Sequence, residues 1–174
     1  VGELRERGCD VVYTREPGGT LLGEKIRDLV LNPDYGNVDS VTELLLYGAS
    51  RRQHVHELIA PALLAGKYVI CDRYAASTVA YQGAGRGLDT TAVDMVNELS
   101  MGGRDADLTI VLDLSVDDAL ARRGERGERE DRLELAGRRL QELAREAYRE
   151  FAANEPASRV LLDAAGAEDV VFEA

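Results

Sequence analysis

Residues 68–74 read Tyr68-Val69-Ile70-Cys71-Asp72-Arg73-Tyr74, a short apolar run followed directly by an acid and an arginine. An earlier stretch has a similar order, because residues 10–14 (Asp-Val-Val-Tyr-Thr) lead into Arg15-Glu16-Pro17-Gly18-Gly19. Two further apolar runs cover residues 108–112 and 159–162. The runs at 68–71, 108–112 and 159–162 are continuous rather than alternating, which predicts strands of a parallel sheet that are buried on both faces.

Segments with apolar residues at helical spacing separate these runs. They cover residues 22–31, 41–64 with a bend at Pro61, 90–99 with Asp89 as N-cap, 116–123 and 133–153. Strands alternating with helices predict a three-layer α/β fold. We expect residues 1–174 to form a single domain that is truncated at both ends, because the sequence opens and stops within helix-like segments.

The composition excludes several classes of protein. With 21 basic and 32 acidic residues the net charge is −11, which argues against a general binder of nucleic acid or of anionic membranes. No stretch is long and apolar enough for a membrane span, so we expect a cytoplasmic protein. Cys9 and Cys71 suggest no disulfide framework, and His54 and His56 lack a third ligand for zinc.

The predicted strand ends indicate where a ligand binds. In parallel sheets ligands bind beyond the carboxyl ends of the strands, and two strands deliver an arginine beside a carboxylate to that edge, as Arg15-Glu16 and Asp72-Arg73. A guanidinium can hold a phosphate through two hydrogen bonds, so the pattern favours an anion site. The alternative is a pair of solvated loop salt bridges.

Two helix faces could receive the rest of such a ligand. Tyr47 and Arg51 are four apart and share a face, which suits a nucleobase that stacks on the ring and bonds to the arginine. The alternative is a core tyrosine with an arginine passing over it. Thr78, Tyr81 and Gln82 share one face of a helix that begins at the expected anion site.

Four stretches carry a resemblance to a known family. They are Thr14-Arg15-Glu16-Pro17-Gly18-Gly19-Thr20, residues 44–55 (Leu-Leu-Leu-Tyr-Gly-Ala-Ser-Arg-Arg-Gln-His-Val), Cys71-Asp72-Arg73-Tyr74, and residues 77–88 (Ser-Thr-Val-Ala-Tyr-Gln-Gly-Ala-Gly-Arg-Gly-Leu). In this order and spacing the chain resembles the bacterial thymidylate kinases, nucleoside monophosphate kinases with a P-loop fold. The resemblance covers essentially the whole chain, although Tyr47 stands where the family more often has phenylalanine.

The resemblance implies a role for each site residue. Tyr47 would stack on thymine, Arg51 would bond its edge, Thr78 and Gln82 would flank base and sugar, and Tyr81 would exclude a ribose 2′-hydroxyl. Arg73 and Arg27 would hold the acceptor phosphate of dTMP, with Glu16 beside the substrate. Asp72 would approach Mg²⁺ and the phosphates through water.

The arginine-rich segment 122–132 resembles the lid that closes over ATP. It contains Arg122, Arg123, Arg126, Arg129 and Arg132, of which Arg126 or Arg132 is expected to reach the transferring phosphoryl group, with Arg132 favoured, while the others bind ATP. Gly124 and Gly127 interrupt the run, as suits a closing segment. The alternative is a solvated helix face laced with weak ion pairs.

One family feature does not occur in the sequence. The first strand and its Gly-x-x-x-x-Gly-Lys-Ser/Thr loop are not found, and Gly66-Lys67 is no phosphate loop. Without that central strand we expect the four strands to form two separated pairs and residues 1–174 alone to be inactive.

The resemblance implies a homodimer that phosphorylates dTMP to dTDP with ATP and Mg²⁺. A kinase for a different nucleotide and a non-catalytic nucleotide-binding subunit stay open as alternatives.

Overall fold

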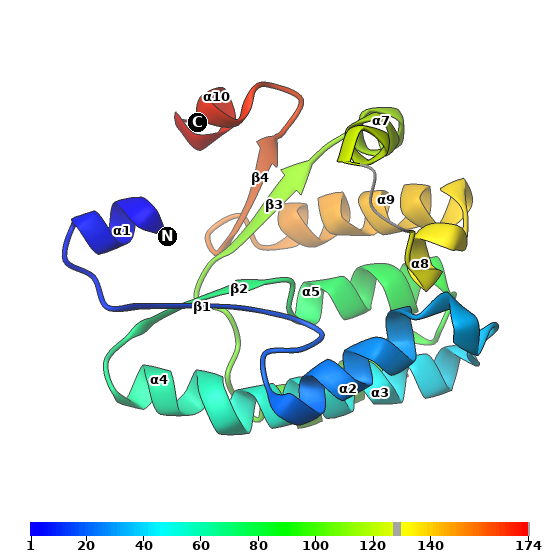
Figure 1. Cartoon of the computed structure of the whole chain (residues 1–174), viewed down its shortest axis with the longest axis horizontal. Coiled ribbons are helices and arrows are strands. Elements are labelled where there is room, and N and C mark those ends of the chain that lie inside the picture. The colour runs from blue at the N-terminus through cyan, green and yellow to red at the C-terminus, as the bar shows by residue number, and fades with distance from the viewer. Residues whose placement is uncertain (127–129, 174) are drawn as a thin grey trace.

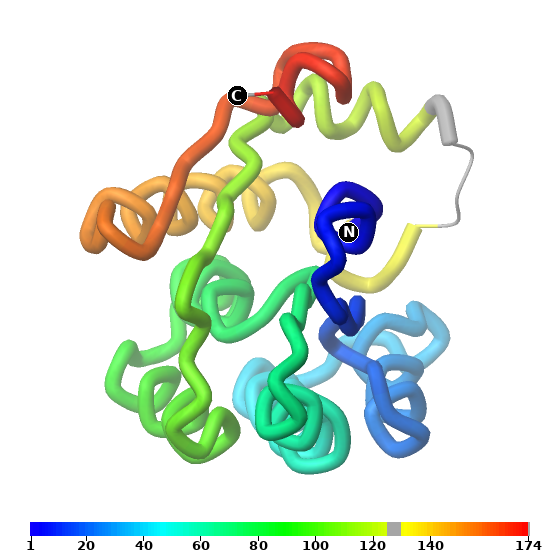
Figure 2. The backbone as a smooth tube through the Cα atoms, turned by 90° about the vertical axis from the view of Figure 1, so that its left-hand side faces the viewer, coloured from blue at the N-terminus to red at the C-terminus, as the bar shows by residue number. Residues whose placement is uncertain are grey.

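The strands and helices alternate along the chain in a computed structural model that describes residues 1–126 and 130–173 (Figures 1 and 2). The strands are β1 (Val11–Arg15), β2 (Tyr68–Asp72), β3 (Thr109–Asp113) and β4 (Arg159–Asp163). The longer helices are α2 (Leu21–Leu31), α3 (Ser40–His54), α6 (Thr90–Met101), α7 (Val116–Arg126) and α9 (Arg138–Asn154). The shorter ones are α1 (Gly2–Glu6), α4 (Ala60–Leu64), α5 (Ala75–Thr78), α8 (Arg132–Leu135) and α10 (Glu168–Glu173). A 3-10 turn, η1 (Pro33–Tyr35), and two π-helical segments, η2 (Val55–Ile59) and η3 (Val79–Gly85), complete the described elements.

The four strands form two separate parallel pairs, as the sequence predicts. β1 pairs with β2 and β3 pairs with β4, and no ladder joins β2 to β3 in the described residues. In the first pair Arg15 lies opposite Asp72, so both predicted ligand-binding turns leave the same edge of the sheet. Helix α4 packs against β2, and α9 packs against β3 and β4.

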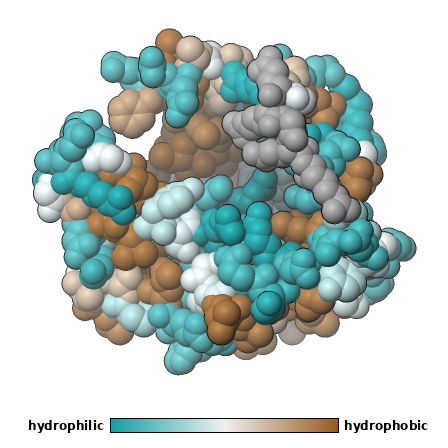
Figure 3. Space-filling model, viewed as in Figure 1, coloured by the Kyte–Doolittle hydropathy of each residue, from teal (hydrophilic) through white to brown (hydrophobic). Residues whose placement is uncertain are grey.

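The predicted burial of the strands on both faces is wrong for this structure. Tyr68 of β2 and Ile110 and Leu112 of β3 expose 59%, 55% and 60% of their surface. Figure 3 shows a hollow over β3 and β4 with hydrophobic residues at its back. Ile110 and Leu112 alternate with the buried Val111, so they lie on one face of β3, beside the space that is left between the unpaired edges of β2 and β3. We call this space the slot between β2 and β3.

The helices follow the predicted segments, with breaks that have local causes. The predicted bend in 41–64 coincides with η2, where the π-helical turn precedes Pro61. The predicted helix 133–153 is divided at Gly137, whose φ of +92° suits glycine and separates α8 from α9. Asp89 caps α6 as expected, since its carboxylate accepts from the Ala92 backbone NH at 3.2 Å. No helix of the described residues is long and apolar enough to span a membrane.

The main apolar core lies where α2, α3, α8 and α9 meet. It contains Ile26, Val30, Tyr47, Leu133 and Leu140, and a second cluster of Ala80, Ala144 and Ala147 lies between η3 and α9. Small alanines at that contact let α9 approach η3 closely. The core therefore fixes α3 and η3, the two segments that carry the predicted base site.

The slot predicts a binding site for a hydrophobic dye. A protein made of residues 1–174 should increase the fluorescence of 1-anilinonaphthalene-8-sulfonate, because apolar strand faces are open to solvent. Leu112→Ser should reduce that signal clearly. Leu99→Ser, which changes a leucine of α6 that is 79% exposed, serves as the control and should reduce it less. Equal effects of the two substitutions would contradict a specific slot.

Candidate active site

One face of α3 carries Glu43, Tyr47 and Arg51 at intervals of four residues, so their side chains follow one another along the helix. All three residues are buried, with 0%, 9% and 1% of their surface exposed. Tyr47 belongs to the core cluster that also contains Val30 and Leu133, so it packs in the core as the alternative interpretation expects. Burial raises the pKa of the Tyr47 phenol, and the charge of Glu43 raises it further.

Arg51 is held by three side chains from three other parts of the chain. Its Nε donates to Glu16 Oε2 at 2.8 Å, its Nη1 to Asn97 Oδ1 at 2.6 Å and its Nη2 to Thr78 Oγ1 at 2.9 Å. A guanidinium has five N–H donors, so one hydrogen on each terminal nitrogen is left after these bonds. Arg51 can therefore bond a further acceptor while it keeps the bonds that orient it.

Glu16 lies in the turn after β1, and its second carboxylate oxygen also has a side-chain partner. Glu16 Oε1 lies 3.0 Å from His54 Nδ1, and His54 Nε2 lies 2.7 Å from Thr14 Oγ1. Gly19 passes so close to this group that a Cβ would lie 2.5 Å from the His54 ring, and its φ is +76°. Only glycine fits there, which explains the Gly18-Gly19 pair after the strand.

The predicted face of Thr78, Tyr81 and Gln82 lies on α5 and η3. Thr78 and Gln82 are buried, Thr78 accepting from Arg51 and Gln82 donating from Nε2 to Glu43 Oε1 at 2.8 Å. Tyr81 is partly buried, and its ring lies 5.3 Å from the Arg73 guanidinium carbon. The structure thus brings the three together with Arg51, Glu43 and Arg73.

Asp72 and Arg73 follow β2 at the predicted edge. Asp72 is the last residue of β2 and is exposed, and its carbonyl accepts from the Glu16 backbone NH at 2.9 Å. Arg73 has a φ of +68°, a conformation that residues with a side chain adopt at a cost and that clusters at functional sites. This backbone turn places the Arg73 guanidinium against Tyr81.

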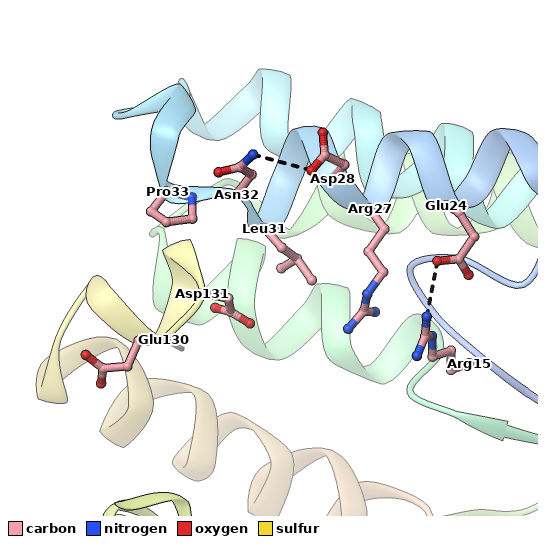
Figure 4. Close-up of a pocket in the computed structure, with 9 residues that line it drawn as sticks. All are labelled: Arg15, Glu24, Arg27, Asp28, Leu31, Asn32, Pro33, Glu130 and Asp131. Atoms are coloured by element: carbon pink, nitrogen blue, oxygen red, sulfur yellow. Dashed lines mark hydrogen bonds and ion pairs between the residues drawn. The ribbon is translucent and has the colours of Figure 1, made fainter. Parts of the chain in front are cut away.

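A pocket of about 480 Å³ lies beyond the end of β1, with two arginines pointing into it (Figure 4). Arg15 and Arg27 line one side, and Asp131 lines the opposite side. Arg27 Nη1 donates to the Pro17 carbonyl at 2.9 Å, and Arg15 Nη2 lies 3.1 Å from Glu24 Oε2. The described lining includes Arg27 but not Arg73, so the pairing of these two on one phosphate stays a prediction.

Comparison with known proteins identifies the family. The family model described as thymidylate kinase matches residues 1–174. The chain belongs to the thymidylate kinase family.

Individual relatives agree with this assignment. A thymidylate kinase of Pelotomaculum thermopropionicum is 43% identical over 169 residues, covering 97% of this chain and 78% of that protein. One of Bdellovibrio bacteriovorus is 43% identical over 175 residues, covering 98% and 82%. The crystal structure of thymidylate kinase from Ehrlichia chaffeensis aligns with a TM-score of 0.71 at 33% identity, covering 94% of this chain and 76% of that chain.

These findings confirm the α/β P-loop fold class and the reaction of a nucleoside monophosphate kinase, phosphorylation of dTMP with ATP. The two alternatives, a kinase for another nucleotide and a non-catalytic binding subunit, are not favoured.

The arginines of the predicted lid segment 122–132 have partners wherever their side chains are described. Arg122 donates to the carbonyls of residues 165 and 166, and Arg123 lies 3.0 Å from Glu130 and 3.2 Å from Glu134. The helix α7 runs to Arg126, beyond the predicted end at 123. Arg129 and the side chain of Arg126 lie outside the described residues.

Arg132 is buried and has partners within the protein. It is 7% exposed, its Nε donates to the Val30 carbonyl at 2.8 Å, and its Nη2 bonds to Glu43. A buried guanidinium needs such a counterion, and the nearest carboxylate in the core is Glu43. The predicted contact between Arg132 and a phosphoryl group stays a prediction.

Two residues of the site were missed in the sequence. Glu43 accepts hydrogen bonds from Gln82, Arg86 and Arg132, and Asn97 orients Arg51. An acid four residues before Tyr47 on the same helix face was a signal for Glu43, since a charge among apolar neighbours needs partners. Asn97 carries no comparable signal, because its partner comes from a helix far away in sequence.

One cluster in the described residues has the composition of a metal site. Ligand atoms of Glu16, His54 and Cys71 lie within 4.8 Å of one another. Both nitrogens of His54 and both oxygens of Glu16 are within hydrogen-bond distance of other groups. Burial raises the pKa of the Cys71 thiol, with Glu16 and Asp72 adding to the effect, so it stays protonated and is a poor metal ligand.

Proposed function

We propose that dTMP binds with its thymine against Tyr47 and within reach of Arg51. The observation that carries this is the state of Arg51, which is fixed by Glu16, Asn97 and Thr78 and keeps N–H donors on its terminal nitrogens. A donor held in this way loses little conformational freedom when a ligand binds. It can therefore distinguish one base from another by the acceptors on the edge of the base. Thr78 and Gln82 flank the base and sugar, and Tyr81 excludes a 2′-hydroxyl.

The acceptor phosphate of dTMP binds in the pocket beyond β1. Arg27 points into this pocket beside Arg15, and Arg73 directly follows β2, the strand that is paired with β1. Arginines at this edge neutralise the phosphate charge and position its oxygen for attack. Glu16 contributes by holding Arg51 rather than by touching the phosphate.

Phosphoryl transfer from ATP depends on charge stabilisation at the same edge. Asp72 is exposed at the end of β2, and a carboxylate oxygen is the ligand that Mg²⁺ prefers, so its chemistry fits a role in holding the ion through water. When bound, Mg²⁺ neutralises charge on the phosphates of ATP. Arg126 or Arg132 stabilises the transferring group, while Arg122, Arg123 and Arg129 bind ATP.

We propose that the slot between β2 and β3 takes a further parallel strand in the complete protein. The exposed apolar faces of Ile110 and Leu112 and the unpaired edges of β2 and β3 support this. The family resemblance supplies the identity of that strand, the first of the fold, together with its phosphate loop for ATP. Residues 1–174 on their own should therefore be inactive.

The protein acts in the cytoplasm as a homodimer, with dTMP and ATP as its ligands and without nucleic-acid or membrane partners. Helices α2, α3 and α6 pack side by side and expose large apolar side chains, which are Leu21, Leu22, Val41, Leu45, Met95 and Leu99. A face of this kind is typical of a surface that a second copy covers. The net charge of −11 supports the absence of nucleic-acid binding.

Substitutions at Tyr47 test the base site. In the complete protein Tyr47→Leu should weaken dTMP binding by about 1–3 kcal/mol, the scale of a lost base–aromatic stack. Leucine keeps most of the volume, which limits the cavity left in the core. Calorimetric titration with dTMP measures the effect, and Tyr47→Phe, which keeps the ring, should bind as the wild type does. If the leucine variant also binds as the wild type does, the base site is elsewhere.

Alanine substitutions of the five lid arginines identify the group that stabilises the transition state. At the responsible position, Arg126 or Arg132, kcat should fall at least about a hundredfold while the KM for dTMP stays nearly constant, since the contact forms mainly in the transition state. Arg132→Ala should also lower the melting temperature, because it removes a partner of the buried Glu43.

The control for this series is Arg139→Ala, which changes an arginine of α9 whose side chain is 78% exposed. It should leave both kinetic constants unchanged. If all five lid variants keep kcat within about threefold of the wild type, the lid only covers the site, and the stabilising cation comes from the phosphate loop.

A further inference from the structure

The Glu43 carboxylate is the meeting point of donors from three segments. It is completely buried on α3. Its Oε1 accepts from Gln82 Nε2 at 2.8 Å and from Arg86 Nε at 3.3 Å. Its Oε2 accepts from Arg86 Nη2 at 3.1 Å and from Arg132 Nη2. Each oxygen therefore has two donors, which is close to the full capacity of a carboxylate.

The charges in this cluster make its geometry hard to change. One buried carboxylate faces two guanidiniums, of which Arg132 is almost fully buried and Arg86 is partly exposed. Burial raises the pKa of Glu43, but the hydrogen bonds from Arg86, Gln82 and Arg132 outweigh it and bring the pKa below its ordinary value. The carboxylate is thus ionised at neutral pH, and moving it would leave the buried Arg132 without its counterion.

The donors connect two parts of the site that are far apart in sequence. Gln82 belongs to η3, where it is proposed to flank the base and sugar, and Arg132 is both the first residue of α8 and the last residue of the segment 122–132. Asp131 caps α8 by accepting from the Leu133 and Glu134 backbone NH groups. Leu133 of α8 packs in the same core cluster as Tyr47. Glu43 thus connects η3, which carries part of the proposed base site, to the first residue of α8.

We propose that Glu43 is a positioning residue for this reaction: its carboxylate orients Gln82 toward dTMP and anchors α8 to α3 through Arg132. Glu43 itself touches no substrate, because all four donor contacts come from the protein and its surface is fully covered. The part of this proposal that concerns Gln82 rests on the proposed base site, whereas the anchoring of α8 does not.

Two substitutions test separately the charge and the position of the Glu43 carboxylate. Glu43→Gln removes the charge and keeps the length. Glu43→Asp keeps the charge but withdraws the carboxylate by about 1.5 Å, one carbon–carbon bond, so it preserves the ion balance that the fold needs. Glu150→Gln, which changes an exposed acid of α9, is the matched control. All variants are made in the complete protein, and their melting temperatures are measured first.

The first readout is hydrogen exchange of the backbone amides of α8 without ligands. In Glu43→Asp the amides of Leu133, Glu134 and Leu135 should exchange at least about tenfold faster than in the wild type, while those in the middle of α9 should not change. Glu150→Gln should show wild-type exchange at α8. Unchanged exchange at α8 in both Glu43 variants would overturn the anchoring role.

The second readout is the KM for dTMP in a mutant cycle with Gln82→Ala. Both Glu43→Asp and Gln82→Ala should raise KM about tenfold or more, and the double variant should be no worse than about twice the worse single, because both changes act through one contact. A purely structural role would lower kcat through loss of folded enzyme and leave KM unchanged. Wild-type KM in Glu43→Asp, or effects that multiply in the double variant, would overturn the positioning of Gln82.

The same data distinguish this proposal from the proposed base site. If Gln82→Ala itself leaves KM unchanged, the proposed contact between Gln82 and dTMP fails, and with it the base-side role of Glu43. The exchange at α8 then decides the anchoring role alone, since that readout needs no substrate.

Discussion

The buried ion pair between Glu16 and Arg51 is the interaction on which the site depends. It joins the turn after β1 to α3, and Arg51 extends it to α5 through Thr78 and to α6 through Asn97. Removing a charge from water costs several kcal/mol, so a pair of this kind persists only when its remaining donors and acceptors are satisfied. In the described part of the chain every buried side-chain nitrogen and oxygen has a hydrogen-bond partner. Four elements that are distant in sequence are thereby held in one arrangement around Arg51.

The face of α3 that carries Glu43, Tyr47 and Arg51 has an ion pair at each end. Arg51 is bound to Glu16 near one end, Glu43 is bound to Arg132 and Arg86 near the other, and Tyr47 lies between them in the core. Because both ends are fixed, the tyrosine ring has little room to move. A base that stacks on it would meet a surface whose shape is already set, which lowers the entropic cost of binding.

Local patterns in the sequence predict the strands and helices well. The features that they do not predict depend on contacts between residues that are distant in sequence. The strand runs and the Asp89 cap are confirmed, because they depend on neighbouring residues, and the two strand pairs agree with what the family resemblance implies. Strand burial was predicted wrongly, since it depends on a neighbour across the slot. The bond from Arg132 to Glu43 spans 89 residues, and no local pattern in the run 122–132 indicates that partner. The face with Tyr47 and Arg51 was visible from spacing, but the three acceptors that orient Arg51 were not.

A crystal structure of the complete protein with dTMP tests the central claim most directly. The account predicts that thymine lies on the Tyr47 ring with an Arg51 terminal nitrogen within about 3.2 Å of an acceptor on the base edge, while Arg51 keeps its bond to Glu16. It would be contradicted by a complex in which no Arg51 nitrogen contacts the base and thymine binds away from α3.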